Sequence, residues 1–282
     1  MKHILVVWEN SRSSDKALRK ANLLAKHANA TVKVVSFIGT TTDASTDEQK
    51  ITALSEQLEN SIDHVFEPGI EVSCKLVDCD DIADWICQTC KKSGFDLVIK
   101  SKHKSKSVLY SPTDWKLIRQ LTCSLLLIDS SPKKKSNHRV LITLDVKSTS
   151  TLQQQINTKV LSTAKQWANY DYSHLHATYI IPIAKALEEL VIVEAGDVIH
   201  KKGAAAYKKV QNLLQEHAIN DAEIHISAGN PAIEIASVAS KTKADLVIMG
   251  SVGRKGIKGL LLGNTAEKII NNLHTDLLVI KP

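Results

Sequence analysis

Short aliphatic runs alternate with longer amphipathic stretches along the whole chain. The runs are rich in Val, Ile and Leu, and apolar residues in the intervening stretches recur at helical spacing. This alternation is typical of parallel βα units, in which crossover helices cover both faces of a sheet. The sequence therefore predicts an α/β fold.

The predicted elements form two sets with the same order. In the first half we expect strands at 3–8, 31–38, 70–77, 95–99 and 124–128, and helices at 12–28, 46–66, 80–93 and 113–121. In the second half we expect strands at 138–144, 173–181, 222–227, 244–249 and 276–280, and helices at 150–169, 185–217, 231–242 and 264–273. The helix at 185–217 is expected to break near Gly196 or Gly203.

Three sequence matches indicate that the second half repeats the first. HILVVWE resembles HRVLITLD, FDLVIK resembles ADLVIMG, and TDWKLIRQLTCSLLLI aligns without a gap with TAEKIINNLHTDLLVI. The matches predict two tandem domains, 1–131 and 138–282, joined by a linker at 132–137. Because the order of the matches is preserved, the duplication includes the whole domain.

Each domain is predicted to be a doubly wound parallel sheet of five strands, ordered 3-2-1-4-5, with helices on both faces. The order reverses between the first and fourth strands, and ligands of such sheets bind beyond the carboxyl ends of the strands at that point. The closing strands, SLLLIDS and DLLVIKP, would be apolar edges if left uncovered. We expect them to pair as an internal pseudo-two-fold dimer, which leaves a homodimer of whole chains open.

Composition and charge argue against several classes of protein. The chain has 282 residues, 43% of them apolar; its first apolar stretch is too short for a secretory signal, and no run approaches the roughly 18 residues of a membrane span. Five cysteines, an odd number, are read as reduced thiols, so we expect a cytoplasmic protein. Half of the +6 charge is the three lysines of the linker, and aromatic residues are 4%, which argues against nucleic acid as a partner.

Two short motifs are read as structural. Cys87 and Cys90 form a C-x-x-C late in a predicted helix, where the helix dipole raises a thiol pKa, so we expect neither a redox nor a zinc role. His174 and His176 share one face of a predicted strand, a spacing that suits a metal, but no further ligands accompany them. We therefore assign no metal ligand. No catalytic residue is assigned either, because the P-loop and G-x-S-x-G patterns are missing.

A glycine-rich loop follows the fourth strand of the second half. Gly250, Gly253 and Gly263 let backbone N–H groups approach phosphate oxygens, and Asn264 caps the next helix, whose positive end faces the anion. Asp145, after the first strand, should point into the same crevice and suits a ribose or a bound cation such as Mg²⁺. The spacing predicts a phosphate-binding crevice in the second domain.

MGSVGRKGIKGLLLGNTAEKII and the closing DLLVIKP resemble the universal stress protein family in its tandem-domain form, over nearly the whole chain. The resemblance implies a stress-response protein whose second domain binds an adenine nucleotide, ATP or AMP-type, as a regulatory ligand that changes affinity for an unidentified protein partner. Because no catalytic motif is found, we expect at most slow ATP hydrolysis or autophosphorylation, with Ser251 or Thr265 as acceptor. The site residues it implies are Thr143, Asp145, Ile180, Met249, Gly250, Gly253, Gly263, Asn264 and Thr265.

The corresponding loop of the first half has lost its glycines. Ser101, Lys104 and Ser111 stand in their places, and Pro112 lies opposite Asn264, so we expect no ATP binding there. The stretch KSKHKSK, Lys100 to Lys106, is read as a solvated basic loop, with an anion site as the alternative. A rival for the whole chain is a scaffold, either independent of ligands or binding an apolar, lipid-like molecule beside a vestigial glycine loop.

Overall fold

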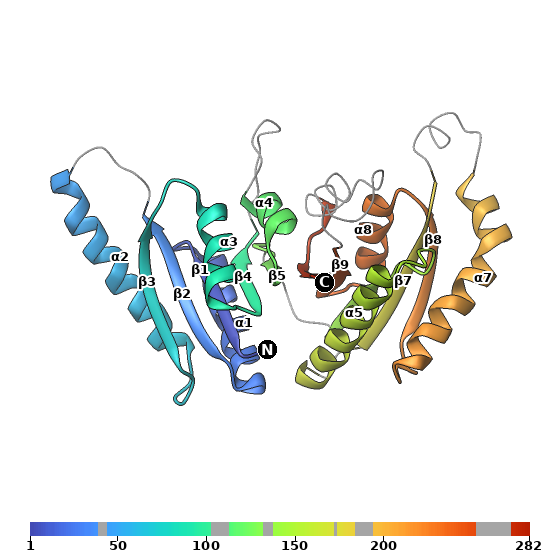
Figure 1. Cartoon of the computed structure of the whole chain (residues 1–282), viewed down its shortest axis with the longest axis horizontal. Coiled ribbons are helices and arrows are strands. Elements are labelled where there is room, and N and C mark those ends of the chain that lie inside the picture. The colour runs from blue at the N-terminus through green and yellow to red at the C-terminus, as the bar shows by residue number, and fades with distance from the viewer. Residues whose placement is uncertain (39–43, 103–112, 132–137, 172–173, 184–193, 252–271) are drawn as a thin grey trace. The chain divides into compact units, whose positions relative to one another are not determined.

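The computed structural model describes residues 1–38, 44–102, 113–131, 138–171, 174–183, 194–251 and 272–282. These residues divide into two compact units, Met1–Ser130 and Ser131–Pro282, which are described separately (Figure 1). Within the described ranges, no helix has the length and apolar character needed to cross a bilayer.

The first unit is a five-stranded parallel sheet with the predicted order, β3-β2-β1-β4-β5. Its elements are β1 His3–Trp8, α1 Arg12–Ala28, β2 Thr31–Ile38, α2 Ala44–Val65, β3 Val72–Asp78, α3 Ile82–Ser93, β4 Leu97–Ser101, α4 Thr113–Gln120 and β5 Ser124–Ile128. Asp81 caps α3 by accepting from two backbone N–H groups, and Gly94 ends it in a left-handed conformation.

The second unit repeats this sheet with the order β8-β7-β6-β9-β10. Its elements are β6 Arg139–Thr143, α5 Thr151–Asp171, β7 His174–Pro182, α7 Ala195–Glu216, β8 Glu223–Gly229, α8 Pro231–Lys241, β9 Leu246–Gly250 and β10 Asp276–Ile280. Residues 185–193 and nearly all of 264–273 lie outside the described ranges. Of the two places expected for a break, α7 begins beside Gly196, with Glu194 as an extended N-cap, and continues through Gly203, where three alanines, strong helix formers, follow.

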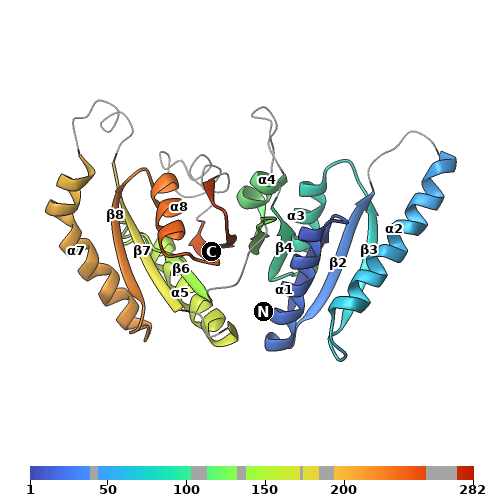
Figure 2. The ribbon, with the colours of Figure 1, turned by 180° about the vertical axis from the view of Figure 1, so that it is seen from behind.

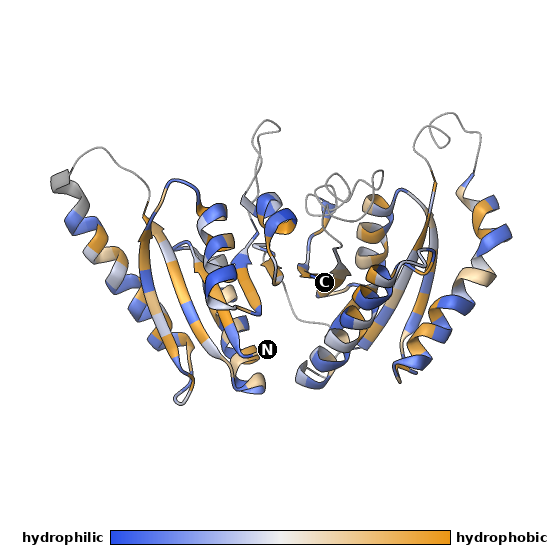
Figure 3. Cartoon of the chain, in the orientation of Figure 1, coloured by the Kyte–Doolittle hydropathy of each residue, from blue (hydrophilic) through white to orange (hydrophobic). Residues whose placement is uncertain are grey.

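Helices lie on both faces of the first sheet, as the doubly wound topology requires. The α1 helix packs against β1, β4 and α2, whereas α3 packs against α4, and the two views place these pairs on opposite faces (Figures 1 and 2). The central strands are buried and strongly hydrophobic, while the helices carry hydrophilic outer positions (Figure 3). The sheets are therefore the cores that the aliphatic runs predicted.

An aspartate that precedes the fourth strand of each unit explains one of the repeated motifs. In the first unit the carboxylate of Asp96 accepts from the backbone N–H groups of Lys2 and His3, at 2.5 and 3.1 Å. In the second, Asp245 accepts from the backbone N–H of Arg139 at 3.2 Å. Burial raises the pKa of Asp96, but the two N–H donors outweigh it and leave that pKa below its ordinary value. In each unit the aspartate therefore connects the start of the first strand to the start of the fourth strand by hydrogen bonds.

Candidate functional site

The second sheet opens at the point where its strand order reverses. The register between β6 and β9 runs only from Val140 opposite Leu246 to Ile142 opposite Ile248. Beyond it, Thr143 still pairs with β7, and Met249 and Gly250 pair with β10. The two central strands therefore part at their carboxyl ends, which is where doubly wound sheets bind ligands.

Asp145 stands at the mouth of this opening, two residues after β6. Its Oδ1 accepts from the backbone N–H groups of Lys147, at 2.9 Å, and Ser148, at 3.2 Å, in an Asx turn. Among the described residues, no group donates a hydrogen bond to its other oxygen, Oδ2. One carboxylate oxygen thus fixes the turn, and the second takes no part in it.

Asn157, on α5, positions Asp145 from behind. It is 5% exposed, its Nδ2 donates to the Asp145 carbonyl at 2.8 Å, and its Oδ1 lies 3.4 Å from the Asp145 backbone nitrogen. Gln153 donates to the same Oδ1 at 3.1 Å and holds the amide in this orientation. A buried amide that pairs with both backbone groups of one residue fixes where the chain leaves β6.

Gly250 has a packing role that the sequence analysis did not anticipate. A Cβ at this position would collide with the side chain of Ile156 on α5 and lie 3.6 Å from Val160 Cγ2. Ile156 and Val160 are fully buried, so the glycine lets α5 lie close to the end of β9. The φ angle of Gly250 is not in the left-handed region. Its lack of a side chain, rather than its conformational freedom, is what the fold requires.

The remaining described residues of the predicted site take different places around the opening. Thr143 is half-buried at the end of β6, and Met249 is buried at the end of β9. Ile180 is buried in β7. Next to Ile180, Tyr179 is also buried, and burial together with the charge of Asp145 raises the pKa of its phenol. Sequence reasoning missed Tyr179.

The corresponding place in the first unit is filled by an internal ion cluster. Lys100, at the position that matches Met249, lies with its Nζ 2.8 Å from Glu9 Oε1 and 3.2 Å from Asp114 Oδ1. The same Nζ donates to the Ser101 carbonyl at 2.9 Å. The side chains of Lys100 and Asp114 are 2% and 1% exposed. Here the register between β1 and β4 continues one pair further, to Val7 opposite Lys100.

The expectation of a solvated basic loop is therefore wrong at Lys100. Burial lowers the pKa of its ammonium, but Asp114 and Glu9 raise it more, and the net direction is upward. Lys100 remains charged and neutralises Glu9, the residue that matches Asp145. Lys102 is also buried, and Lys104 and Lys106 lie outside the described ranges.

The two cysteines of the C-x-x-C motif lie in the interior of the first unit. None of the five forms a disulfide, and Cys87 and Cys90 are buried on the inner side of α3. The main cause that raises the pKa of Cys90 is its hydrogen bond with Cys123, and burial raises it further. The thiol of Cys90 therefore stays protonated and unreactive.

Comparison with known proteins places the chain in a family. The model of the universal stress protein family matches residues 1–129 and again 139–281. The chain belongs to the universal stress protein family. A universal stress protein E homolog from Haemophilus influenzae is 27% identical over 100% of this chain and 97% of its own length. Universal stress protein E from Escherichia coli is 28% identical over 99% and 94%.

A solved structure agrees with the fold. A universal stress protein from Pseudomonas aeruginosa superposes with a TM-score of 0.73 at 24% identity, covering 100% of this chain and 94% of that one. Membership confirms the resemblance and the fold class. Gly253, Gly263, Asn264 and Thr265, the phosphate-binding part of the predicted site, lie outside the described ranges.

Proposed function

We propose that this universal stress protein binds one adenine nucleotide per chain, in its second unit, as a regulatory ligand. The observation that carries the proposal is the parting of β6 and β9 beside Asp145. The carboxylate of Asp145 would line one side of this opening. Its oxygen suits a ribose, because ribose hydroxyls donate hydrogen bonds to carboxylates.

The sequence on the other side of the opening supplies the phosphate partner. The stretch GSVGRKGIKGLLLGNTAE begins at Gly250, directly after β9, and has the glycine spacing that the family resemblance associates with ribose and phosphates. Glycine backbone N–H groups and a capped helix start are the elements that bind phosphate oxygens. The alternative role for Asp145 is to bind a Mg²⁺ ion that accompanies the phosphates, because a carboxylate oxygen is a donor of the type that Mg²⁺ prefers.

The first unit supports a stoichiometry of one. Its loop lacks the glycines, and Lys100 is already paired with Glu9 and Asp114. A nucleotide entering there would have to separate a buried ion cluster, which costs several kcal/mol. The first unit then contributes structure, and occupancy of the second unit is the variable that a protein partner would sense.

The test is a calorimetric titration of the full-length protein, freed of small molecules, with ATP and MgCl₂. We expect one equivalent to bind. Asp145→Asn keeps an oxygen for the Asx turn but removes the charge, and we expect it to weaken binding by about tenfold or more, the difference between charged and neutral hydrogen bonds. Glu9→Gln, the matched change in the first unit, should leave nucleotide affinity unchanged.

Two results would overturn the proposal. One is saturable binding that Asp145→Asn leaves intact, because the site would then lie elsewhere. The other is no binding at all, together with release of a lipid-like molecule when the purified protein is denatured and analysed by mass spectrometry. That second result would favour the scaffold rival.

A further inference from the structure

A second cluster of chemically active side chains lies in the second unit, at the opposite ends of the strands. His176 is the third residue of β7, and Glu223 and His225 are the first and third residues of β8. Asp145, in contrast, follows the carboxyl end of β6. The cluster is therefore separate from the proposed nucleotide site.

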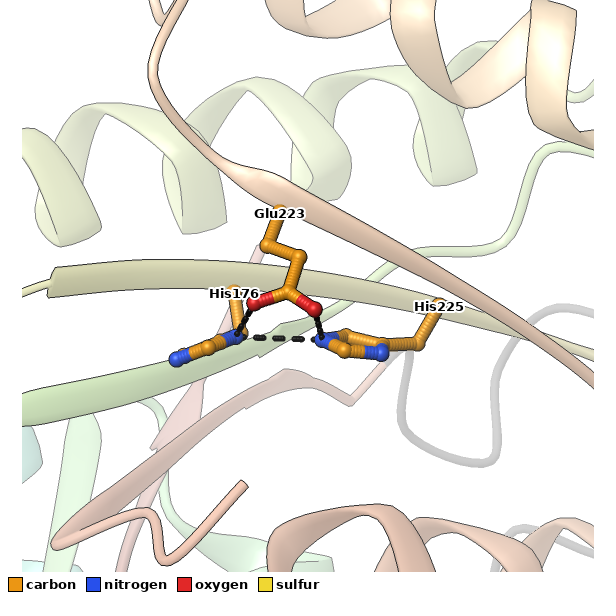
Figure 4. Close-up of side chains that lie close together, drawn as sticks. All are labelled: His176, Glu223 and His225. Carbon is orange, nitrogen blue, oxygen red and sulfur yellow. Dashed lines mark hydrogen bonds and ion pairs between the residues drawn. The ribbon is translucent and has the colours of Figure 1, made fainter. Parts of the chain in front are cut away.

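The register of the sheet brings the three side chains to one face. His176 pairs with Glu223, and Thr178 pairs with His225; residues two apart on a strand, and their partners in register, point to the same side. The hydroxyl of Thr178 donates to the His225 carbonyl at 3.1 Å and fixes this alignment. In Figure 4 both imidazole rings and the carboxylate converge from the two neighbouring strands.

The distances match those of a metal centre. His176 Nδ1 lies 3.1 Å from His225 Nε2 and 3.3 Å from Glu223 Oε2, and Glu223 Oε1 lies 3.9 Å from His225 Nε2. One donor atom from each residue lies within 4.8 Å of the others. Zinc bonds of about 2.0–2.2 Å in a tetrahedron place neighbouring ligand atoms about 3.3–3.5 Å apart. The distances from His176 Nδ1 to His225 Nε2 and to Glu223 Oε2 lie close to this range, whereas His225 is measured to the other carboxylate oxygen.

The surroundings also suit a cation. The side chain of His176 is 10% exposed and that of His225 24%, while Glu223 is 67% exposed. The rings are therefore held in place and the carboxylate side is open to water.

We propose that His176, Glu223 and His225 form a binding site for a divalent transition metal, with Zn²⁺ as the best match. Two imidazoles and one carboxylate are a ligand set that zinc uses with a fourth position left to water. The expectation that His176 lacks further ligands is wrong, because Glu223 and His225 come from the neighbouring strand. The metal would tie the edge strand β8 to β7.

The test uses the full-length protein, treated with EDTA and kept reduced, and titrated with ZnCl₂ in competition with a chromophoric chelator. We expect His225→Asn and Glu223→Gln each to weaken the tightest Zn²⁺ equivalent by at least about tenfold, the scale on which even indirect perturbation of a metal site acts. The control is His174→Asn, an exposed histidine on the same strand, which should leave that equivalent unchanged. Circular dichroism of the metal-free variants verifies folding.

Cobalt(II) separates this site from the five cysteines. Bound by nitrogen and oxygen, the first equivalent should show visible d–d bands without the ultraviolet charge-transfer bands of thiolate ligands. Thiolate bands at the first equivalent would overturn the proposal. So would unchanged Zn²⁺ affinity in both His225→Asn and Glu223→Gln, or an equal loss in His174→Asn.

Discussion

The role assigned to Gly250 gives the sharpest test of the packing around the candidate site. In Gly250→Ala the new methyl group would collide with Ile156 and contact Val160, both fully buried on α5. Overpacking of a filled core costs about 1–3 kcal/mol, and loss of unfolded-state freedom on replacing glycine returns about 0.4–1 kcal/mol. We expect a net destabilisation of about 1–2 kcal/mol.

A second substitution identifies the cause. Ile156→Ala removes the methyl group that is in the way and by itself should cost about 2–5 kcal/mol, because it leaves a cavity. In the double variant the alanine at 250 occupies part of that cavity. We therefore expect the double variant to be more stable than the sum of the single effects, with a coupling of about 1–3 kcal/mol.

Urea unfolding of the four proteins, followed by circular dichroism, measures these differences. Full additivity, or a Gly250→Ala variant as stable as the parent, would refute the packing argument. ATP titration of the double variant adds a functional measurement. If Gly250 serves packing alone, the double variant keeps nucleotide affinity, whereas a close approach of phosphate to residue 250 would reduce it.

Three further predictions concern single side chains. Lys100→Met removes the ammonium that lies beside the buried carboxylate of Asp114, and we expect a loss of about 3–5 kcal/mol in urea unfolding. Asn157→Ala leaves the backbone groups of Asp145 without their partner, so we expect a loss of about 1–3 kcal/mol and weaker ATP binding by calorimetry. Asp96 has a lowered pKa, so its stabilisation is complete above the ordinary aspartate pKa and disappears as the pH falls through the lower, folded value. Asp96→Asn should therefore be less stable than the parent at pH 7, and the gap should close in acid unfolding.

The fold could be predicted from the sequence because strands and helix ends are encoded by residues that are close together along the chain. Aliphatic runs identified the strands, and the duplication, together with crossover handedness, predicted the order 3-2-1-4-5 in both units. Capping residues such as Asp81 and Gly94 lie where the predicted helix over 80–93 begins and ends. Of the two glycines at which a break was expected, Gly196 lies at the start of α7, whereas at Gly203 the alanines that follow keep the helix continuous.

The candidate sites were harder to predict because their geometry depends on contacts across the sheet. Asn157 is twelve residues from Asp145, and no pattern distinguishes it from other polar residues of α5. Glu223 joins His176 only through the register of β7 and β8. The sequence offered one usable signal: two strands that each carry histidines near their start would, in register, bring those rings together.

The two units differ at the place where we propose a nucleotide site in the second. In both units a polar side chain accepts a hydrogen bond from a backbone N–H just after the first strand. Ser14 accepts from Glu9 at 3.0 Å, and Asn157 accepts from Asp145. The decisive difference is Lys100, a cation where the second unit has a methionine. Removing Lys100 alone would not make the first unit resemble the second, because the buried carboxylate of Asp114 would remain at this place. The first unit therefore differs from the second in its packed core and not only in the glycine loop.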